Sequence, residues 1–138
     1  MSARYEHFPH EADVGVRGIG PTPADAFAGA ALAMTAAITE PDSVRPEIAV
    51  AVECRAASLD DLLYDWLNAL VFEMATRRML FGRFEVKIAD GVLTGTAWGE
   101  TVSVARHQPA VEAKGATYTG LRVFEDARGW VAECIVDV

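Results

Sequence analysis

Two segments of the chain carry the same helix start signal followed by an apolar stripe, and they limit the possible folds more than any other feature. Residues 22–38 begin with Thr22 as a cap, and Asp25 stands three residues later. Residues 58–74 repeat this signal with Ser58 as the cap. In both segments the apolar residues recur at helical spacing. The sequence therefore predicts two amphipathic helices, each with one face toward a core.

Strand signals occupy most of the remaining chain. The clearest is Asp90-Gly91, which stands between two alternating segments and is the standard signal of a tight type I′ hairpin. A polar turn at residues 126–129 separates a second antiparallel pair. Strands are expected at residues 14–17, 48–54, 84–88, 92–97, 117–124 and 130–138. Because most connections are hairpins, the sequence predicts an α+β fold with two helices packed on a mainly antiparallel sheet.

The composition is that of one globular domain. With 138 residues, of which 51% are hydrophobic, a single domain over residues 1–138 is expected. The first residues lack the apolar stretch of a secretory signal, and no segment approaches the length of a membrane span. A cytoplasmic protein without a membrane partner is therefore expected. Cys54 and Cys134 stand among alternating apolar residues without CxxC spacing, which favours reduced core thiols over a disulfide or a metal site.

The charge balance bears on nucleic-acid binding. Twelve Lys and Arg against twenty Asp and Glu give a formal net charge of −8, which repels a phosphate backbone. Tight direct binding of RNA is therefore not expected. Arg77, Arg78 and Arg83 form a local basic patch, and we interpret it as a solvated helix end, where cations favour the helix dipole.

The sequence contains no standard catalytic motif. A Walker loop, a GxSxG elbow, HExxH, a dinucleotide fingerprint and a zinc CxxC pair are all missing, so an enzyme is not expected. What remains is a set of polar residues in unusual places, namely His10, Asp13, His107, Lys114 and Asp137. The two histidines are candidates for general bases or ligands. An ordinary surface role is the alternative for both of them and for Lys114.

The two aspartates allow two interpretations. Asp137 lies in an otherwise apolar terminal segment, and Asp13 lies where a loop enters a strand. In the first interpretation Asp137 faces water on the polar side of an edge strand, on the same face as Glu133. In the second the two aspartates converge, since first and last strands often lie near each other, and they hold a hard cation through oxygen ligands. The residues alone leave both open.

A polar stripe runs along the second expected helix. Asp61, Asp65 and Asn68 follow one another at i, i+4 and i+7, which places them on one helix face opposite the apolar residues. Such a stripe is typical of a solvated face. A row of exposed carboxylates is also suited to contact with a partner protein, and this second interpretation stays open.

Four blocks of sequence together resemble the archease family. Residues 8–16, FPHEADVGV, are similar to its HTADVG signature, and residues 62–68, LLYDWLN, to its LLxxWLN helix. Arg106-His107 followed by residues 114–121, KGATYTGL, resembles its KAVTYHGL block. Residues 129–138 resemble its GW…LDV ending. The blocks occur in the same order as in the family and span residues 5–138, which makes coincidence a poor explanation.

The resemblance implies both a fold and a function. The fold is α+β, with a strand-helix-strand-strand module inserted into the remaining sheet. The function is that of an accessory protein for an RtcB-type RNA ligase, which joins RNA ends in tRNA splicing and RNA repair through a GMP-linked histidine. Archeases promote the guanylylation of that ligase and its repeated turnover. A divalent metal, Ca²⁺ or in function Mg²⁺ or Mn²⁺, is the implied cofactor.

The family's functional residues carry over to specific positions. Its metal site falls on Asp13, Asp137 and the backbone carbonyl of Val138, and its functionally important lysine falls on Lys114. His10 and His107 match further signature positions. Departures from the family pattern are Ser103 in place of an acidic residue, Gly115 in place of valine or alanine, and Thr119 in place of histidine.

Two rival functions follow from the same residues. One is a modulator or chaperone of another RNA enzyme, such as a tRNA methyltransferase, which is a role also attached to the family. The other is a small metal-dependent hydrolase with Asp13, Asp137 and His10 around the cation. The sequence has no obvious pair of nucleophile and base, which counts against the hydrolase.

Overall fold

A computed structural model of the chain describes residues 3–10 and 13–138, with only the backbone of Pro9 and His10. The strands of the described chain are β1 (Arg4–His10), β2 (Asp13–Gly20), β3 (Ile48–Arg55), β4 (Met79–Ala89), β5 (Val92–Thr101), β6 (Gly115–Ala116), β7 (Arg122–Asp126) and β8 (Gly129–Asp137). The helices are α1 (Pro23–Ile38), α2 (Leu59–Arg77), the short α3 (Val104–His107) and the 3₁₀ turn η1 (Pro41–Ser43).

The strands form two antiparallel sheets. A five-stranded sheet has the order β1-β2-β8-β6, with β7 also paired to β8. A three-stranded sheet has the order β3-β5-β4. The second sheet and α2 come from one continuous stretch of chain, β3-α2-β4-β5. This confirms the expected α+β class and the inserted strand-helix-strand-strand module.

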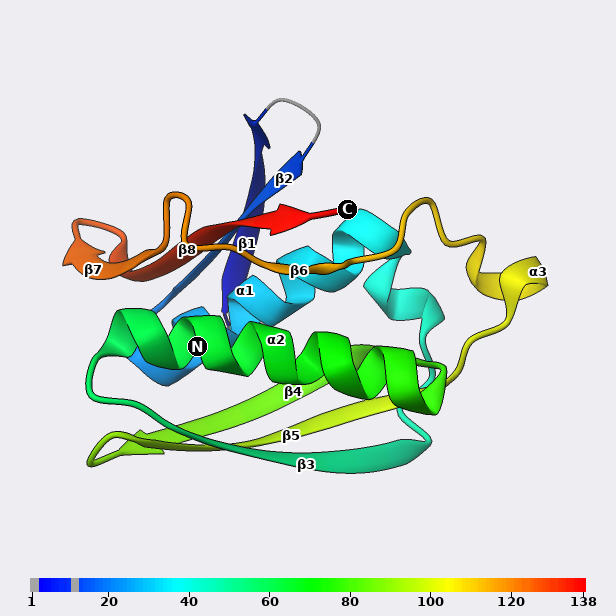
Figure 1. Cartoon of the computed structure of the whole chain (residues 1–138), viewed down its shortest axis with the longest axis horizontal. Coiled ribbons are helices and arrows are strands. Elements are labelled where there is room, and N and C mark those ends of the chain that lie inside the picture. The colour runs from blue at the N-terminus through cyan, green and yellow to red at the C-terminus, as the bar shows by residue number, and fades with distance from the viewer. Residues whose placement is uncertain (1–2, 11–12) are drawn as a thin grey trace.

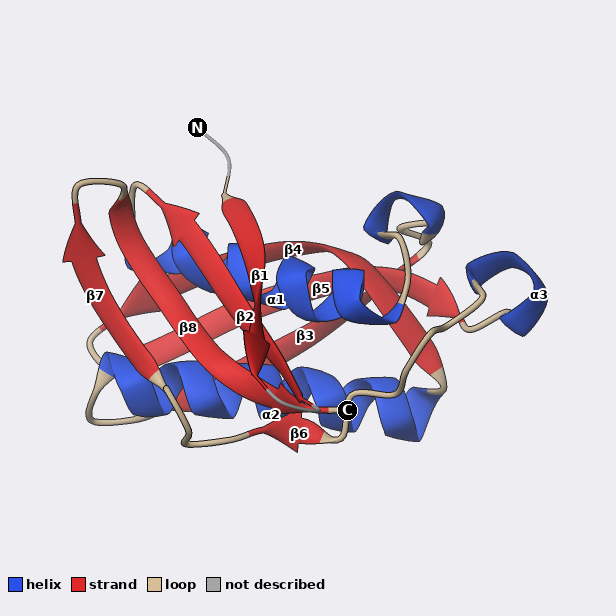
Figure 2. Cartoon of the chain, turned by 90° about the horizontal axis from the view of Figure 1, so that it is seen from above, coloured by secondary structure: helices blue, strands red, loops and turns tan. Residues whose placement is uncertain are grey.

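The two long helices fill the space between the sheets (Figure 1). In Figure 2 the five-stranded sheet is seen from above, with α1 behind its strands. One core joins the layers, because Val16 and Cys134 of the five-stranded sheet, Phe27 of α1, and Leu67 of α2 belong to the same buried apolar cluster as Leu93 of the three-stranded sheet. Burial of apolar surface on both sides of each helix is the main stabilising contribution to such a fold.

Both helix starts agree with their predicted caps. The hydroxyl of Thr22 accepts a hydrogen bond from the N–H of Asp25 at 3.2 Å, and that of Ser58 accepts one from Asp61 at 3.1 Å. These bonds satisfy backbone donors that have no partner within the helix. Between strand and helix, a Cβ placed on Gly18 would lie 1.9 Å from the backbone oxygen of Ala26, so β2 and α1 approach each other as only glycine permits.

The hairpins are partly as expected. Asp90 and Gly91 have φ values of 53° and 74°, as a type I′ turn requires, which confirms the first hairpin. The expected strand over residues 117–124 is confirmed only from Arg122 onward, where β7 begins, and it is wrong before that because the chain turns between β6 and β7. In that turn the N–H of Leu121 bonds to the carbonyl of Tyr118, and Gly120 has a φ of 63°. β7 then pairs with β8 across a short turn.

The last strand corrects one interpretation of Asp137. β8 pairs with β2 on one side and with β6 and β7 on the other, so it is a central strand and not an edge strand. Cys54 and Cys134 are both buried and free, which confirms the expected core thiols. Within the described ranges, none of the helices is long and apolar enough to cross a membrane.

Candidate functional site

The pairing of the strands brings the predicted polar residues to one end of the five-stranded sheet. His10 ends β1 opposite Asp13 at the start of β2. Val14 pairs with Val136, and the same register one step further places Asp13 opposite Asp137. On the other side of β8, the N–H of Lys114 donates to the carbonyl of Asp137 at 2.8 Å. We call Asp13, Lys114, Asp137 and Val138 the strand-end site. The side chain of His10 lies outside the described residues.

The two aspartates share the outer face of the sheet. Successive side chains of a strand point to opposite faces. Val16 and Cys134 point inward to the core, whereas Arg17 and Glu133 form an ion pair at 2.7 Å on the other face. Asp13 and Asp137 are separated from this pair by even numbers of residues, so they lie on its face. Asp137 is exposed and Asp13 is half-buried.

The donors of the strand-end site suit a hard divalent cation. Carboxylate oxygens and backbone carbonyls are the ligands that Ca²⁺ and Mg²⁺ prefer. Among the side chains that the structure describes, neither Asp13 nor Asp137 takes part in an ion pair that would neutralise it. Asp13 also lines a hollow of about 300 Å³ together with His7, Phe8 and Val14. In the described part of the chain, no three His, Cys, Asp or Glu residues gather closely enough to form a metal cage.

Helix α2 holds the segment that carries Lys114. The side-chain oxygen of Asn68 accepts the N–H of Ala116 at 2.9 Å, and its amide group donates to the carbonyl of Ala116 at 3.4 Å. A Cβ on Gly115 would lie 3.1 Å from the same Asn68 oxygen. The glycine, a departure from the family pattern, therefore leaves space for the two hydrogen bonds between Asn68 and Ala116. Asn68 is therefore a structural residue, and the interpretation of a fully solvated stripe is wrong for it. The side chain of Lys114 is exposed.

His107 lies away from the strand-end site in a buried polar cluster. Its Nδ1 accepts the N–H of Ser103 at 2.9 Å, so the proton is on Nε2, which donates to Oε2 of Glu100 at 3.0 Å. The other oxygen of Glu100 pairs with Arg106, and the N–H of Arg45 donates to Oε2 at 2.8 Å. The hydrogen bonds from Arg106 and Arg45, with a further bond from His107, lower the pKa of Glu100 to about 2.

The sequence indicated His107 only as a candidate base or ligand, and it gave no indication of Glu100. The alternating pattern of β5 does not predict a buried carboxylate, because Glu100 follows directly on Gly99 near the end of the strand. The spacing of Glu100 and His107 does not distinguish a buried pair from two surface residues. The cluster exists because α3 folds back on the end of β5 and on the segment after η1, which is a long-range arrangement.

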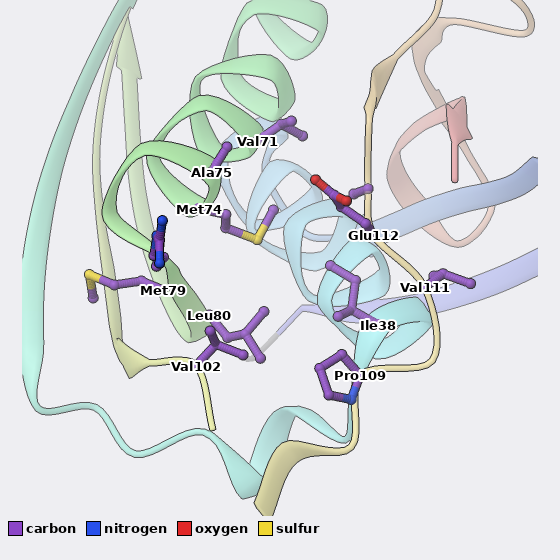
Figure 3. Close-up of a pocket in the computed structure, with 12 residues that line it drawn as sticks. Ile38, Val71, Met74, Ala75, Met79, Leu80, Val102, Pro109, Val111 and Glu112 are labelled. Atoms are coloured by element: carbon purple, nitrogen blue, oxygen red, sulfur yellow. The ribbon is translucent and has the colours of Figure 1, made fainter. Parts of the chain in front are cut away.

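An apolar pocket of about 200 Å³ lies beside the segment between α3 and Lys114 (Figure 3). Met74 of α2, Leu80 of β4, and Val102 line it from one side, and Pro109 and Val111 close the other. The carboxylate of Glu112 stands at the same pocket.

Comparisons with known proteins agree on one family. Residues 5–138 match the model of the Archease protein family (MTH1598/TM1083). The chain is 33% identical to Protein archease of Pyrococcus furiosus, with 98% of this chain and 99% of the relative covered. It is 36% identical to Protein archease of Methanopyrus kandleri, with coverages of 97% and 99%. The solution structure of Methanobacterium thermoautotrophicum protein 1598 superposes with a TM-score of 0.85 and 33% identity, over 97% of this chain and 98% of that one.

Proposed function

Because the chain belongs to the archease family, we propose that it is an accessory protein that activates an RtcB-type RNA ligase and is not itself an enzyme. In this proposal it promotes the transfer of GMP from GTP to the ligase histidine, and so allows repeated turnover. The observation that supports the proposal best is the convergence of Asp13, Asp137 and Lys114 at one end of the five-stranded sheet.

A divalent cation would be held by the carboxylates of Asp13 and Asp137 with the backbone carbonyl of Val138. When bound, it supplies positive charge that neutralises phosphate oxygens during nucleotidyl transfer. Asp13 and Asp137 come from neighbouring strands, so their separation is fixed by the sheet register.

Lys114 would act on the same phosphates as a point charge. Its N–H is bonded to the carbonyl of Asp137, which fixes its backbone relative to the metal-binding carboxylates. Asn68 holds the chain two residues further on. The exposed side chain of Lys114 therefore extends from a backbone whose position is fixed, which favours a role in positioning GTP in the ligase site.

The decisive experiment measures ligase-GMP formation with GTP, Mn²⁺ and small amounts of this protein. We expect wild type to raise the rate and Lys114→Ala to lower the stimulated rate by about tenfold or more, as for loss of a charge that stabilises a transition state. Lys87→Ala is the matched control, because Lys87 is an exposed lysine on the three-stranded sheet. An unchanged rate with wild type over a range of ratios refutes the activator function. Equal losses in both lysine variants refute the role of Lys114.

A further inference from the structure

Tyr64 and Tyr118 form a stacked pair at the surface. Their ring centroids are 4.2 Å apart and their planes differ by 8°. Tyr64 is half-buried on α2, whereas Tyr118 is 67% exposed in the turn between β6 and β7. Tyr64 covers one face of the Tyr118 ring, and the exposure of Tyr118 leaves the opposite face to solvent. An aromatic ring held in this way offers a flat apolar surface to a partner.

The turn that carries Tyr118 is fixed to the sheet. The hydroxyl of Thr117 donates to the carbonyl of Ile135 at 2.9 Å and accepts the N–H of Thr119 at 3.2 Å. The N–H of Ile135 in turn donates to the carbonyl of Thr119 at 3.2 Å. The ring is therefore held in place before any partner binds, which lowers the entropic cost of using it in an interface.

Two carboxylates stand beside the stacked pair. Asp61 and Asp65 lie one helical turn apart on α2, and Tyr64 follows Asp61 at i+3. Desolvation raises the pKa of the Tyr118 phenol, and so does the adjacent Tyr64. The negative charges of Asp61 and Asp65 raise the same pKa further. Over the residues that the structure describes, neither carboxylate forms an ion pair.

This chain stacks arginine on aromatic rings elsewhere. The guanidinium carbon of Arg17 lies 4.5 Å from the centre of the Phe8 ring. Two more such contacts are Arg83 over Trp98 at 4.8 Å and Arg122 over Phe124 at 4.3 Å. For Tyr118, the described residues supply no such arginine, although its ring is exposed and lies beside two carboxylates.

We propose that Tyr118, with Asp61 and Asp65, is a docking site for an arginine side chain of the ligase partner, an inference that rests on the proposed function. A guanidinium is planar, so it stacks on the free ring face while its N–H groups donate to a carboxylate, which an ammonium group cannot match. A nucleobase of RNA is the other group that stacks on tyrosine, but it brings phosphates that two carboxylates and a net charge of −8 repel.

The docking site and the strand-end site are connected through α2 and through the segment of residues 114–118. Asn68 follows Asp61 and Asp65 on the same face of α2, and it clamps Ala116, two residues from Lys114. Tyr118 lies two residues beyond Ala116 in the same segment. A partner arginine on Tyr118 therefore seats the ligase against the rigid segment that presents Lys114. The site is expected to set how tightly the ligase binds, and not how fast guanylylation proceeds once it is bound.

The experiment compares one variant that removes the two charges with one that removes the aromatic ring. The charge variant combines Asp61→Asn and Asp65→Asn, and the ring variant is Tyr118→Leu. We expect each to raise the concentration that gives half-maximal guanylylation by about tenfold or more, with the maximal rate unchanged. Tyr118→Phe keeps the ring and is expected to stay close to wild type. The combination of Glu53→Gln and Glu85→Gln is the charge-matched control, since both residues are exposed on the three-stranded sheet.

Calorimetric titration of the ligase with each protein separates this inference from the proposed function. An unchanged half-maximal concentration in the Asp61/Asp65 and Tyr118→Leu variants overturns the docking site, and so does an equal effect of the Glu53/Glu85 control. Binding by wild type that weakens in both docking variants, without any activation, keeps the docking site and refutes the activator function. No binding of the ligase by wild type overturns both. Tight binding of single-stranded RNA that is lost with Tyr118→Leu overturns the arginine assignment.

Discussion

Nε2 of His107 donates to Oε2 of Glu100 across 3.0 Å, and both side chains are almost completely buried. The bond joins α3 to the end of β5. The hydroxyl of Thr39 adds a second attachment by donating to the carbonyl of His107 at 2.6 Å. Since the chain runs from α3 directly to Lys114, this cluster anchors one end of the segment whose other end is held by Asn68.

The first prediction concerns the pH dependence of stability. The pKa of Glu100 is lowered from 4.5 to about 2 by hydrogen bonds from Arg106, Arg45 and His107. Because the unfolded chain takes up this proton first, the contribution of Glu100 is complete above about pH 4.5 and is lost as the pH falls toward 2. Thermal melts between pH 6 and pH 2 should show a shallower loss of stability in Glu100→Gln than in wild type. Parallel curves for the two proteins contradict it.

The second prediction separates His107 from Lys114. Removal of a buried ring that carries two hydrogen bonds leaves Glu100 and the N–H of Ser103 short of partners. His107→Ala should therefore lower the free energy of unfolding by about 1–3 kcal/mol. Lys114→Ala removes an exposed side chain, so it should change this free energy by no more than about 0.5 kcal/mol. Urea unfolding measures both. A smaller loss in His107→Ala than in Lys114→Ala contradicts the structural role of the cluster.

Local signals in the sequence predicted local structure well. The caps Thr22 and Ser58 and the turn at Asp90-Gly91 depend on hydrogen bonds and backbone angles within a few residues, and the structure confirms them. The same logic failed for residues 117–121, although the paired strand from Arg122 onward is as predicted. Tyr118 and its neighbours alternate like a strand, but a φ of 63° at Gly120 and the attachment of Thr117 to β8 turn the chain there.

Long-range relationships could not be predicted from spacing. The approach of Asp13 to Asp137 depends on the register of β2 with β8, which are more than a hundred residues apart in the chain. The family resemblance pointed to this pair, whereas the residues alone left it open. The burial of Glu100 against His107 had no local signal, because a polar residue near the end of a strand is ordinarily solvated.

The third prediction concerns RNA. Three arginines on or beside the five-stranded sheet are already paired, since Arg17 and Arg122 both bind Glu133, and Arg128 binds Asp126. With a net charge of −8, few cations remain to release counterions from a phosphate backbone. The purified protein should therefore not retain tRNA in a gel shift at physiological salt. Retention at submicromolar protein contradicts this, and a ligase with bound RNA is the positive control.

The last prediction concerns the cation at the strand-end site. If Asp13 and Asp137 share it, removal of either carboxylate leaves a coordination shell that one acid cannot fill, so affinity for Ca²⁺ or Mn²⁺ should collapse while the core stays intact. A metal at one hundred times its dissociation constant stabilises the folded state by about 2.7 kcal/mol, so wild type should melt at a higher temperature with metal. Asp13→Ala and Asp137→Ala should lose this shift, whereas Asp42→Ala, an exposed aspartate of η1, should keep it. Equal affinity by calorimetry in all four proteins refutes the shared site. Full guanylylation activity in a variant that no longer binds metal shows that the cation has no part in activation.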